Sequence, residues 1–199
     1  MTDLIIKNAR LMNRKELVNI SIKDAYIIGI DDVANSQNND DTANKTVYDA
    51  KENFVCAGFY ESHIHLDKAC ILDRCSVEQG DLQEAVEETG KAKKEFTEED
   101  VFARASKLIE MAIKKGTVGL RTFVETDPKT ELRSFEAIKR ARDKYAFAID
   151  IEICAFAQSG LTNDLHTQNL IPQALSQGAD LIGGCPYKDD NPDRHIEMI

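Results

Sequence analysis

The spacing of hydrophobic and polar positions changes near residue 53. Before it, short apolar runs are separated by turn-forming residues, a pattern typical of β-strands. We expect strands at 4–6, 17–22, 26–30 and 46–49, with a turn at Asp24-Ala25 and a polar loop at 35–41. Because such short strands need another layer to cover them, this region alone does not make a complete core.

After residue 53, strand-like runs alternate with segments whose apolar residues recur at helical spacing. Expected strands lie around 58–67 and at 117–125, 147–156 and 180–185; expected helices lie at 81–94, 97–116, 132–145 and 169–177, with a last one beginning at 191. This alternation favours parallel βαβ units, in either a doubly wound open sheet or a barrel. The first strand is followed by no Gly-x-Gly-x-x-Gly, so a nucleotide-binding fold has little support.

Two histidines end the first strand of this second region, in the segment Gly58-Phe-Tyr-Glu-Ser-His-Ile-His-Leu-Asp67. Residues i and i+2 of a strand point to the same face, so His63 and His65 would direct both imidazoles at one point. Two imidazoles held in this way form half of a zinc or iron site. The alternative is that both histidines are ordinary polar residues at a strand end, hydrogen-bonded to backbone or water.

The composition of the chain limits the kinds of partner that it can bind. The 199 residues carry 25 Lys and Arg against 35 Asp and Glu, a net charge of −10 that repels phosphate backbones and disfavours nucleic-acid binding. No apolar run is long enough to cross a membrane, and the first residues do not have the pattern of a signal peptide. The five cysteines are odd in number and form no Cys-x-x-Cys, so we expect free thiols and a cytoplasmic protein.

Four segments, in this order, resemble the cytosine deaminase / N-isopropylammelide isopropylaminohydrolase branch of the amidohydrolase superfamily: ESHIHLDKACILDRC, GLRTFVETDP, IDIEICAFAQSGLTND and GADLIGGCPYKDDNPDRHI. The resemblance implies an α/β fold, with residues 53–199 as the first half of a metal-dependent (β/α)8 TIM barrel and residues 1–52 as strands of a small β-sandwich domain. It also implies a divalent metal, Fe²⁺ or Zn²⁺, that activates water to hydrolyse a C–N bond of a pyrimidine or a related small nitrogen heterocycle.

The resemblance assigns roles to three residues. His63 and His65 match the two metal ligands of the first barrel strand. Gln158 matches a glutamine that hydrogen-bonds the substrate ring, a task that suits an amide because it offers both a donor and an acceptor; an ordinary loop glutamine is the alternative. Phe123 stands where the branch commonly has histidine, and we assign it no catalytic role. The remaining histidines, at 166 and 195, match no family position, and we expect both at the surface.

The length raises a question about activity. A barrel of this kind needs about 250 residues, and the family's other metal ligands and proton-transfer groups follow strands five to eight. Two ligands rarely hold a catalytic metal. We therefore expect the catalytic residues in a C-terminal half outside these 199 residues, and an inactive chain on its own. Three hypotheses stay open: the N-terminal part of a longer or truncated enzyme, one half of a split enzyme with a separately encoded C-terminal half, or a non-catalytic fragment that forms homo-oligomers through exposed strand edges.

Overall fold

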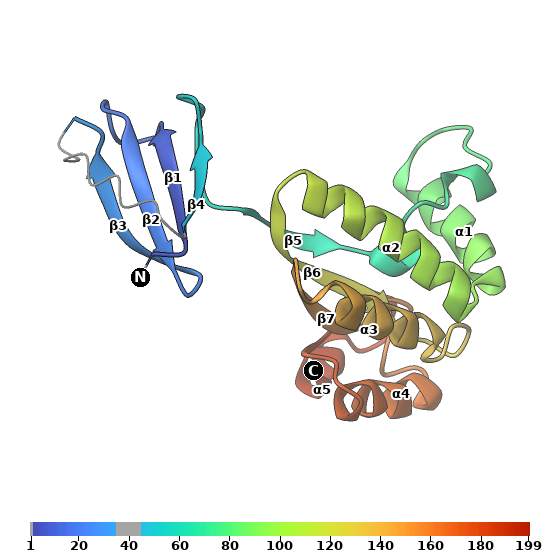
Figure 1. Ribbon diagram of the computed structural model, residues 1–199. Helices are drawn as coiled ribbons and strands as arrows, with labels where there is room; N and C mark the ends of the chain where they lie inside the picture. The colour runs from blue at the N-terminus through green and yellow to red at the C-terminus, as the bar shows by residue number, and fades with distance from the viewer. Residues whose placement is uncertain (1, 35–44) are drawn as a thin grey trace. The chain divides into compact units, whose positions relative to one another are not determined.

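The structure, a computed structural model, describes residues 2–34 and 45–199 (Figure 1). The chain forms two compact units, Met1–Ala57 and Gly58–Ile199. The polar loop predicted at 35–41 lies outside the described residues. Within the described ranges, no helix combines the length and the apolar character needed to cross a membrane.

The first unit contains a four-stranded sheet in the order β3-β2-β1-β4. Its strands are β1 (Leu4–Ala9), β2 (Val18–Lys23), β3 (Tyr26–Asp32) and β4 (Thr46–Asp49). The first three are antiparallel neighbours, and β4 runs parallel to β1. The predicted turn at Asp24-Ala25 is confirmed: φ is 50° and 64°, the left-handed conformation of a two-residue hairpin loop. The four strands confirm those expected from the sequence.

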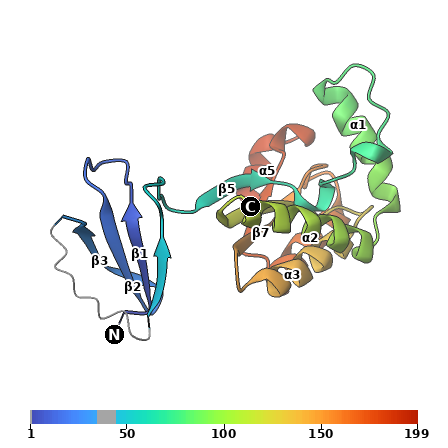
Figure 2. The ribbon, with the colours of Figure 1, turned by 45° about the horizontal axis from the view of Figure 1, so that its top comes forward.

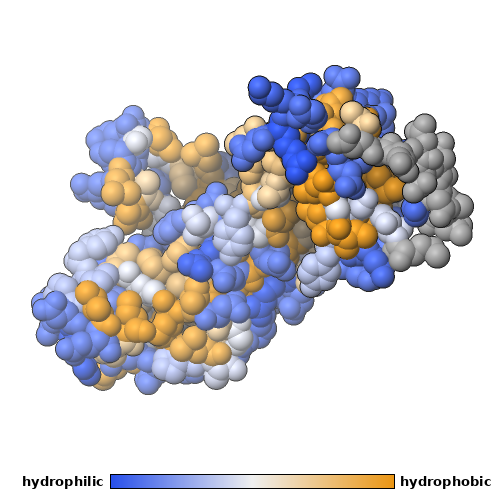
Figure 3. All heavy atoms as spheres, turned by 90° about the vertical axis from the view of Figure 1, so that its left-hand side faces the viewer, coloured by the Kyte–Doolittle hydropathy of each residue, from blue (hydrophilic) through white to orange (hydrophobic). Residues whose placement is uncertain are grey.

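The core of this unit is small. Four apolar residues are buried, Ala9, Val18, Ile20 and Ala50. Others reach the surface, since Ile27 is 63% exposed, and apolar patches are visible on the face in Figure 3. Among the described residues of this unit, no second layer covers the sheet. The β-sandwich therefore stays a prediction.

The second unit contains a parallel sheet in the order β5-β6-β7-β8. Its strands are β5 (Phe59–Ile64), β6 (Thr117–Glu125), β7 (Asp150–Ala157) and β8 (Leu181–Gly184). The α-helices are α1 (Leu82–Ala92), α2 (Glu98–Lys114), α3 (Arg133–Tyr145), α4 (Leu165–Ser176) and α5 (Pro192–Met198). Strands that neighbour one another in chain order are the arrangement of a barrel, whereas a doubly wound sheet reverses its order. The closed barrel stays a prediction.

Helices α2, α3 and α4 pack against the sheet strands, and α2 and α3 lie side by side (Figure 2). Their contact with the sheet explains which strand positions are apolar: Leu120 and Val124 of β6, and Ile153 and Ala155 of β7, are at most 1% exposed. Because side chains alternate along a strand, the residues between them face the other way. That second face carries Phe123, on whose ring His63 stacks.

Most predicted elements are confirmed, and their ends have local causes. Thr97 caps α2 as expected, accepting the N–H of Asp100 at 3.2 Å. Helix α4 begins at Leu165, four residues earlier than expected, because the Asp164 carboxylate accepts the N–H of His166 at 3.0 Å and caps the helix there. Side-chain caps of this kind compete with simple apolar periodicity in setting a helix start.

Candidate functional site

The candidate residues lie at the carboxyl ends of the parallel strands. His63 lies in β5, His65 just after it, and Gln158 just after β7. The two imidazole centroids are 5.4 Å apart with an interplanar angle of 71°. Two imidazoles that share one tetrahedral ion at about 2 Å per bond would have centroids about 5 Å apart. The pair therefore has a spacing that a single divalent metal can bridge.

His65 is oriented by the backbone of the neighbouring strand. Its Nδ1 lies 2.8 Å from the carbonyl oxygen of Phe123. A carbonyl only accepts, so Nδ1 carries the proton and donates it, leaving Nε2 with a free lone pair. Burial, helped by the nearby Lys68 ammonium, lowers the pKa of His65 to about 4. The ring is therefore neutral at physiological pH, the form that binds metal.

Two phenylalanines form the apolar surroundings of the histidines. The Phe123 ring stacks on His63, with centroids 4.2 Å apart and an interplanar angle of 23°. Phe156 packs edge-on against both Phe123 and His65, at 5.4 Å and 6.0 Å. Phe123 therefore offers no polar side-chain atom to the site. Its ring packs on His63, and its backbone carbonyl orients His65.

Gln158 is held at both ends of its amide. Its Oε1 accepts a hydrogen bond from the Lys68 ammonium at 3.2 Å, and its Nε2 donates to the thiol sulfur of Cys185 at 3.3 Å. A ring that bound to Gln158 would share these atoms with Lys68 and Cys185. Lys68 was not predicted as a site residue, although it lies three residues after His65, at the end of the short helical turn Leu66–Lys68.

A buried ionic cluster lies beside this group. The Lys93 ammonium contacts the carboxylates of Glu125 and Asp127 at 2.5 Å and 2.6 Å. Lys68 lies 3.7 Å from Glu125. Burial raises the pKa of Glu125, although both lysines oppose the shift. Burial would also raise the pKa of Asp127, but its hydrogen bond to Lys93 holds that pKa below its ordinary value. Both carboxylates therefore serve as partners of Lys93, which no local sequence pattern indicated.

The segment after β8 corrects one prediction. His195, expected at the surface, is fully buried, while His166 is exposed as predicted. The His195 ring packs on Gly184, where an added Cβ would lie 2.2 Å from its Nε2, and its Nδ1 lies 2.5 Å from Asp189. Asp189 also accepts backbone N–H groups from Leu161 and Thr162. These hydrogen bonds of Asp189 connect the loop after Gln158 to α5, and they explain why His195 is buried.

The part of the chain that the structure describes supplies no third ligand beside the two histidines. Across residues 2–34 and 45–199, no group of three or more His, Cys, Asp or Glu side chains is arranged to hold a metal ion. The site as described supplies two imidazoles, a polar pair formed by Lys68 and Gln158, and an apolar wall.

Comparisons with known proteins show which enzymes the chain resembles. No family model matches the chain. An N-isopropylammelide isopropyl amidohydrolase from Pseudomonas sp. (strain ADP) is 32% identical over 187 residues, which cover 92% of this chain and 45% of that protein. A crystal structure of 5-methylcytosine deaminase from Klebsiella pneumoniae, 30% identical, superposes with a TM-score of 0.83 over 97% of this chain and 46% of its own.

The chain is similar to amidohydrolases in both sequence and structure. The match is to the N-terminal half of these amidohydrolases, and the chain spans about half the length of the relatives that it matches. An atrazine chlorohydrolase from Arthrobacter aurescens TC1, solved with zinc, shares the fold at 12% identity, with a TM-score of 0.65 over 93% of this chain and 48% of its own.

Proposed function

We propose that this chain supplies the first part of the active site of a metal-dependent amidohydrolase that hydrolyses a C–N bond of a pyrimidine or a related nitrogen heterocycle. The observation that carries the proposal is the His63–His65 pair, with its single-ion spacing and with His65 fixed in the tautomer that leaves Nε2 free. Named relatives act on 5-methylcytosine and N-isopropylammelide, both nitrogen heterocycles.

The residues present fit a divalent metal. Both rings come from the end of one strand, one of them neutral and oriented through a backbone carbonyl, as metal-ligating histidines usually are. Such a metal, when bound, activates water for attack at the C–N carbon. Imidazole suits iron and zinc equally, so both Fe²⁺ and Zn²⁺ belong to the proposal.

Gln158 and Lys68 would bind the substrate ring. The amide offers an acceptor and a donor, and Lys68 adds a cation beside its oxygen. Together they can hydrogen-bond a ring edge that carries a carbonyl oxygen next to a ring nitrogen. The apolar faces of Phe123 and Phe156 border the same space through their contacts with the histidines.

Further metal ligands and the proton-transfer groups would come from outside the described residues, from more of the same polypeptide or from a separate chain. Catalytic zinc sites generally use three protein ligands. On this proposal the 199 residues alone do not turn over substrate.

Complementation tests the proposal. The chain is co-expressed with the C-terminal half of the Pseudomonas amidohydrolase, and release of isopropylamine from N-isopropylammelide is measured. We expect activity that requires both chains and is lost with His63→Ala. Robust turnover by the 199 residues alone, or activity that survives a His63→Ala/His65→Ala double variant, would contradict the proposed roles. If co-expression restores no activity, the split-enzyme hypothesis loses its support.

A further inference from the structure

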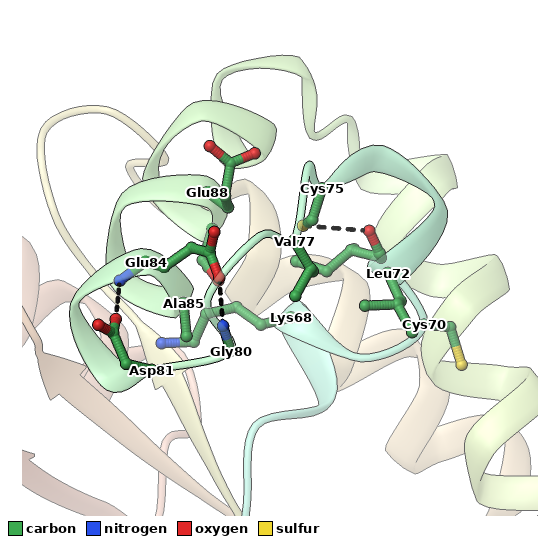
Figure 4. A pocket seen from close by; sticks show the side chains of 12 residues that line it. Lys68, Cys70, Leu72, Cys75, Val77, Gly80, Asp81, Glu84, Ala85 and Glu88 are labelled. Atoms are coloured by element: carbon green, nitrogen blue, oxygen red, sulfur yellow. Dashed lines mark hydrogen bonds between the residues drawn. The ribbon is translucent and has the colours of Figure 1, made fainter.

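A pocket of about 370 Å³ lies between α1 and the segment that precedes it (Figure 4). Its size falls at the lower end of the range for small-molecule sites, about 300–1,000 Å³. Its apolar lining comes from both sides: Ile71, Leu72, Cys75 and Val77 from the segment, and Ala85 from α1.

The carboxylates of Glu84 and Glu88 at the pocket wall already accept hydrogen bonds from backbone N–H groups. Glu84 accepts the backbone N–H groups of Glu78 and Gly80, each at 2.7 Å. Glu88 accepts the N–H of Ser76 at 2.8 Å and pairs with Lys91. These bonds hold residues 76–80 against α1, so the pocket is formed without a ligand. The same carboxylates would repel a phosphate or another anion, and the apolar lining favours an apolar group as the occupant.

Lys68 connects this pocket to the candidate site. Its side chain lines the pocket (Figure 4), while its ammonium bonds to Gln158. A ring whose polar edge lies on Gln158 and Lys68 could therefore extend an apolar substituent along the Lys68 stem into the pocket. The far end of α1 is fixed at the site as well, because Lys93, one residue beyond the helix, contacts Glu125 and Asp127.

We propose that this pocket is a specificity subsite that holds a small apolar substituent on the heterocycle that Gln158 contacts. The inference rests on the proposed function and adds the substrate class to it: alkyl-substituted rings are bound in preference to unsubstituted ones. A group of three carbons transferred from water into an apolar pocket improves binding by about 10-fold or more.

Binding to the full chain tests this subsite without any need for turnover. The probes are cytosine, 5-methylcytosine and N4-isopropylcytosine, followed by NMR of the Ile71, Leu72 and Val77 methyl groups and of the Gln158 side-chain amide. We expect N4-isopropylcytosine to shift both sets of signals and to bind at least about 10-fold more tightly than cytosine. Ala85→Phe, which fills the pocket from an exposed helix position, should remove this advantage.

Val86→Phe is the matched control, because Val86 is the next residue of α1, is 53% exposed and does not line the pocket. Equal affinity for the three probes, with shifts only at Gln158, would overturn the subsite and leave the proposed function standing. Shifts only at the pocket methyl groups would instead overturn the role of Gln158. No response at either place would overturn the subsite directly.

Discussion

Phe123 contacts both histidines of the site, one through its ring and the other through its backbone carbonyl. Stacked aromatic pairs contribute about 0.5–1.5 kcal/mol beyond their buried area. We expect Phe123→Ala to weaken zinc binding by the histidine pair about 2- to 10-fold, because His63 loses the ring that orients it. Calorimetric titration measures this. Phe147→Ala, at an 85% exposed phenylalanine, is the control and should change nothing. Unchanged zinc affinity in Phe123→Ala would contradict a positioning role.

Asp189 should make stability depend on pH. Burial would raise its pKa, but the N–H groups of Leu161 and Thr162, together with His195, hold it at about 2, below the ordinary 3.8. A depressed pKa in the folded state contributes stability above pH 3.8, which is lost as pH falls towards 2. The ionised carboxylate contributes about 2 kcal/mol on this basis.

Asp189→Asn keeps the shape and removes the charge. Urea unfolding between pH 2 and 7 should show the variant less stable by about 2 kcal/mol near neutrality, with the difference shrinking below pH 4. A difference independent of pH would show that the loss comes from geometry and not from ionisation.

Helix α1 links the pocket to the buried ionic cluster, because it forms one wall of the pocket and carries Lys93 just beyond its end. Lys93→Met leaves Glu125 and Asp127 buried without their common cation. Breaking a buried pair in this way costs about 3–5 kcal/mol. We expect this loss in chemical unfolding at pH 7, and a smaller one near pH 4, where Glu125 takes up a proton more readily. Lys94→Met, at the exposed neighbouring position, should have little effect. Equal stability of the two variants would contradict the cluster's structural role.

Elements were predictable where local chemistry decides them. Strand β6 begins and ends at the residues predicted, since Gly116 ends the helix before it and an apolar run defines the strand. The histidine pair was also found, because period-two spacing brings i and i+2 together. Contacts across the fold were not predictable. Lys93 contacts Asp127, which lies 34 residues away in the sequence. His195 is buried only because Gly184 leaves room for its ring and Asp189 accepts a hydrogen bond from its Nδ1.

At the scale of the whole molecule, the second unit exposes the free edges of β5 and β8 among the described residues. Such edges template pairing with another chain. We expect the purified chain to self-associate, with a weight-average mass in sedimentation equilibrium that rises with concentration above the 22.3 kDa of one chain. A constant mass of one chain up to about 100 μM, a concentration at which exposed edges ordinarily associate, would contradict this expectation.

If His63 and His65 bind one divalent metal together, a zinc titration followed by imidazole NMR will show both rings responding to the same ion. The chain contains only four histidines, so His166 and His195 serve as internal controls. We expect the signals of His63 and His65 to move together and saturably, with His65 bound through Nε2 and protonated at Nδ1, and to return when a chelator removes the zinc. The His63→Ala/His65→Ala variant should show no saturable response. A zinc response confined to the exposed His166, or independent responses of His63 and His65, would contradict the claim.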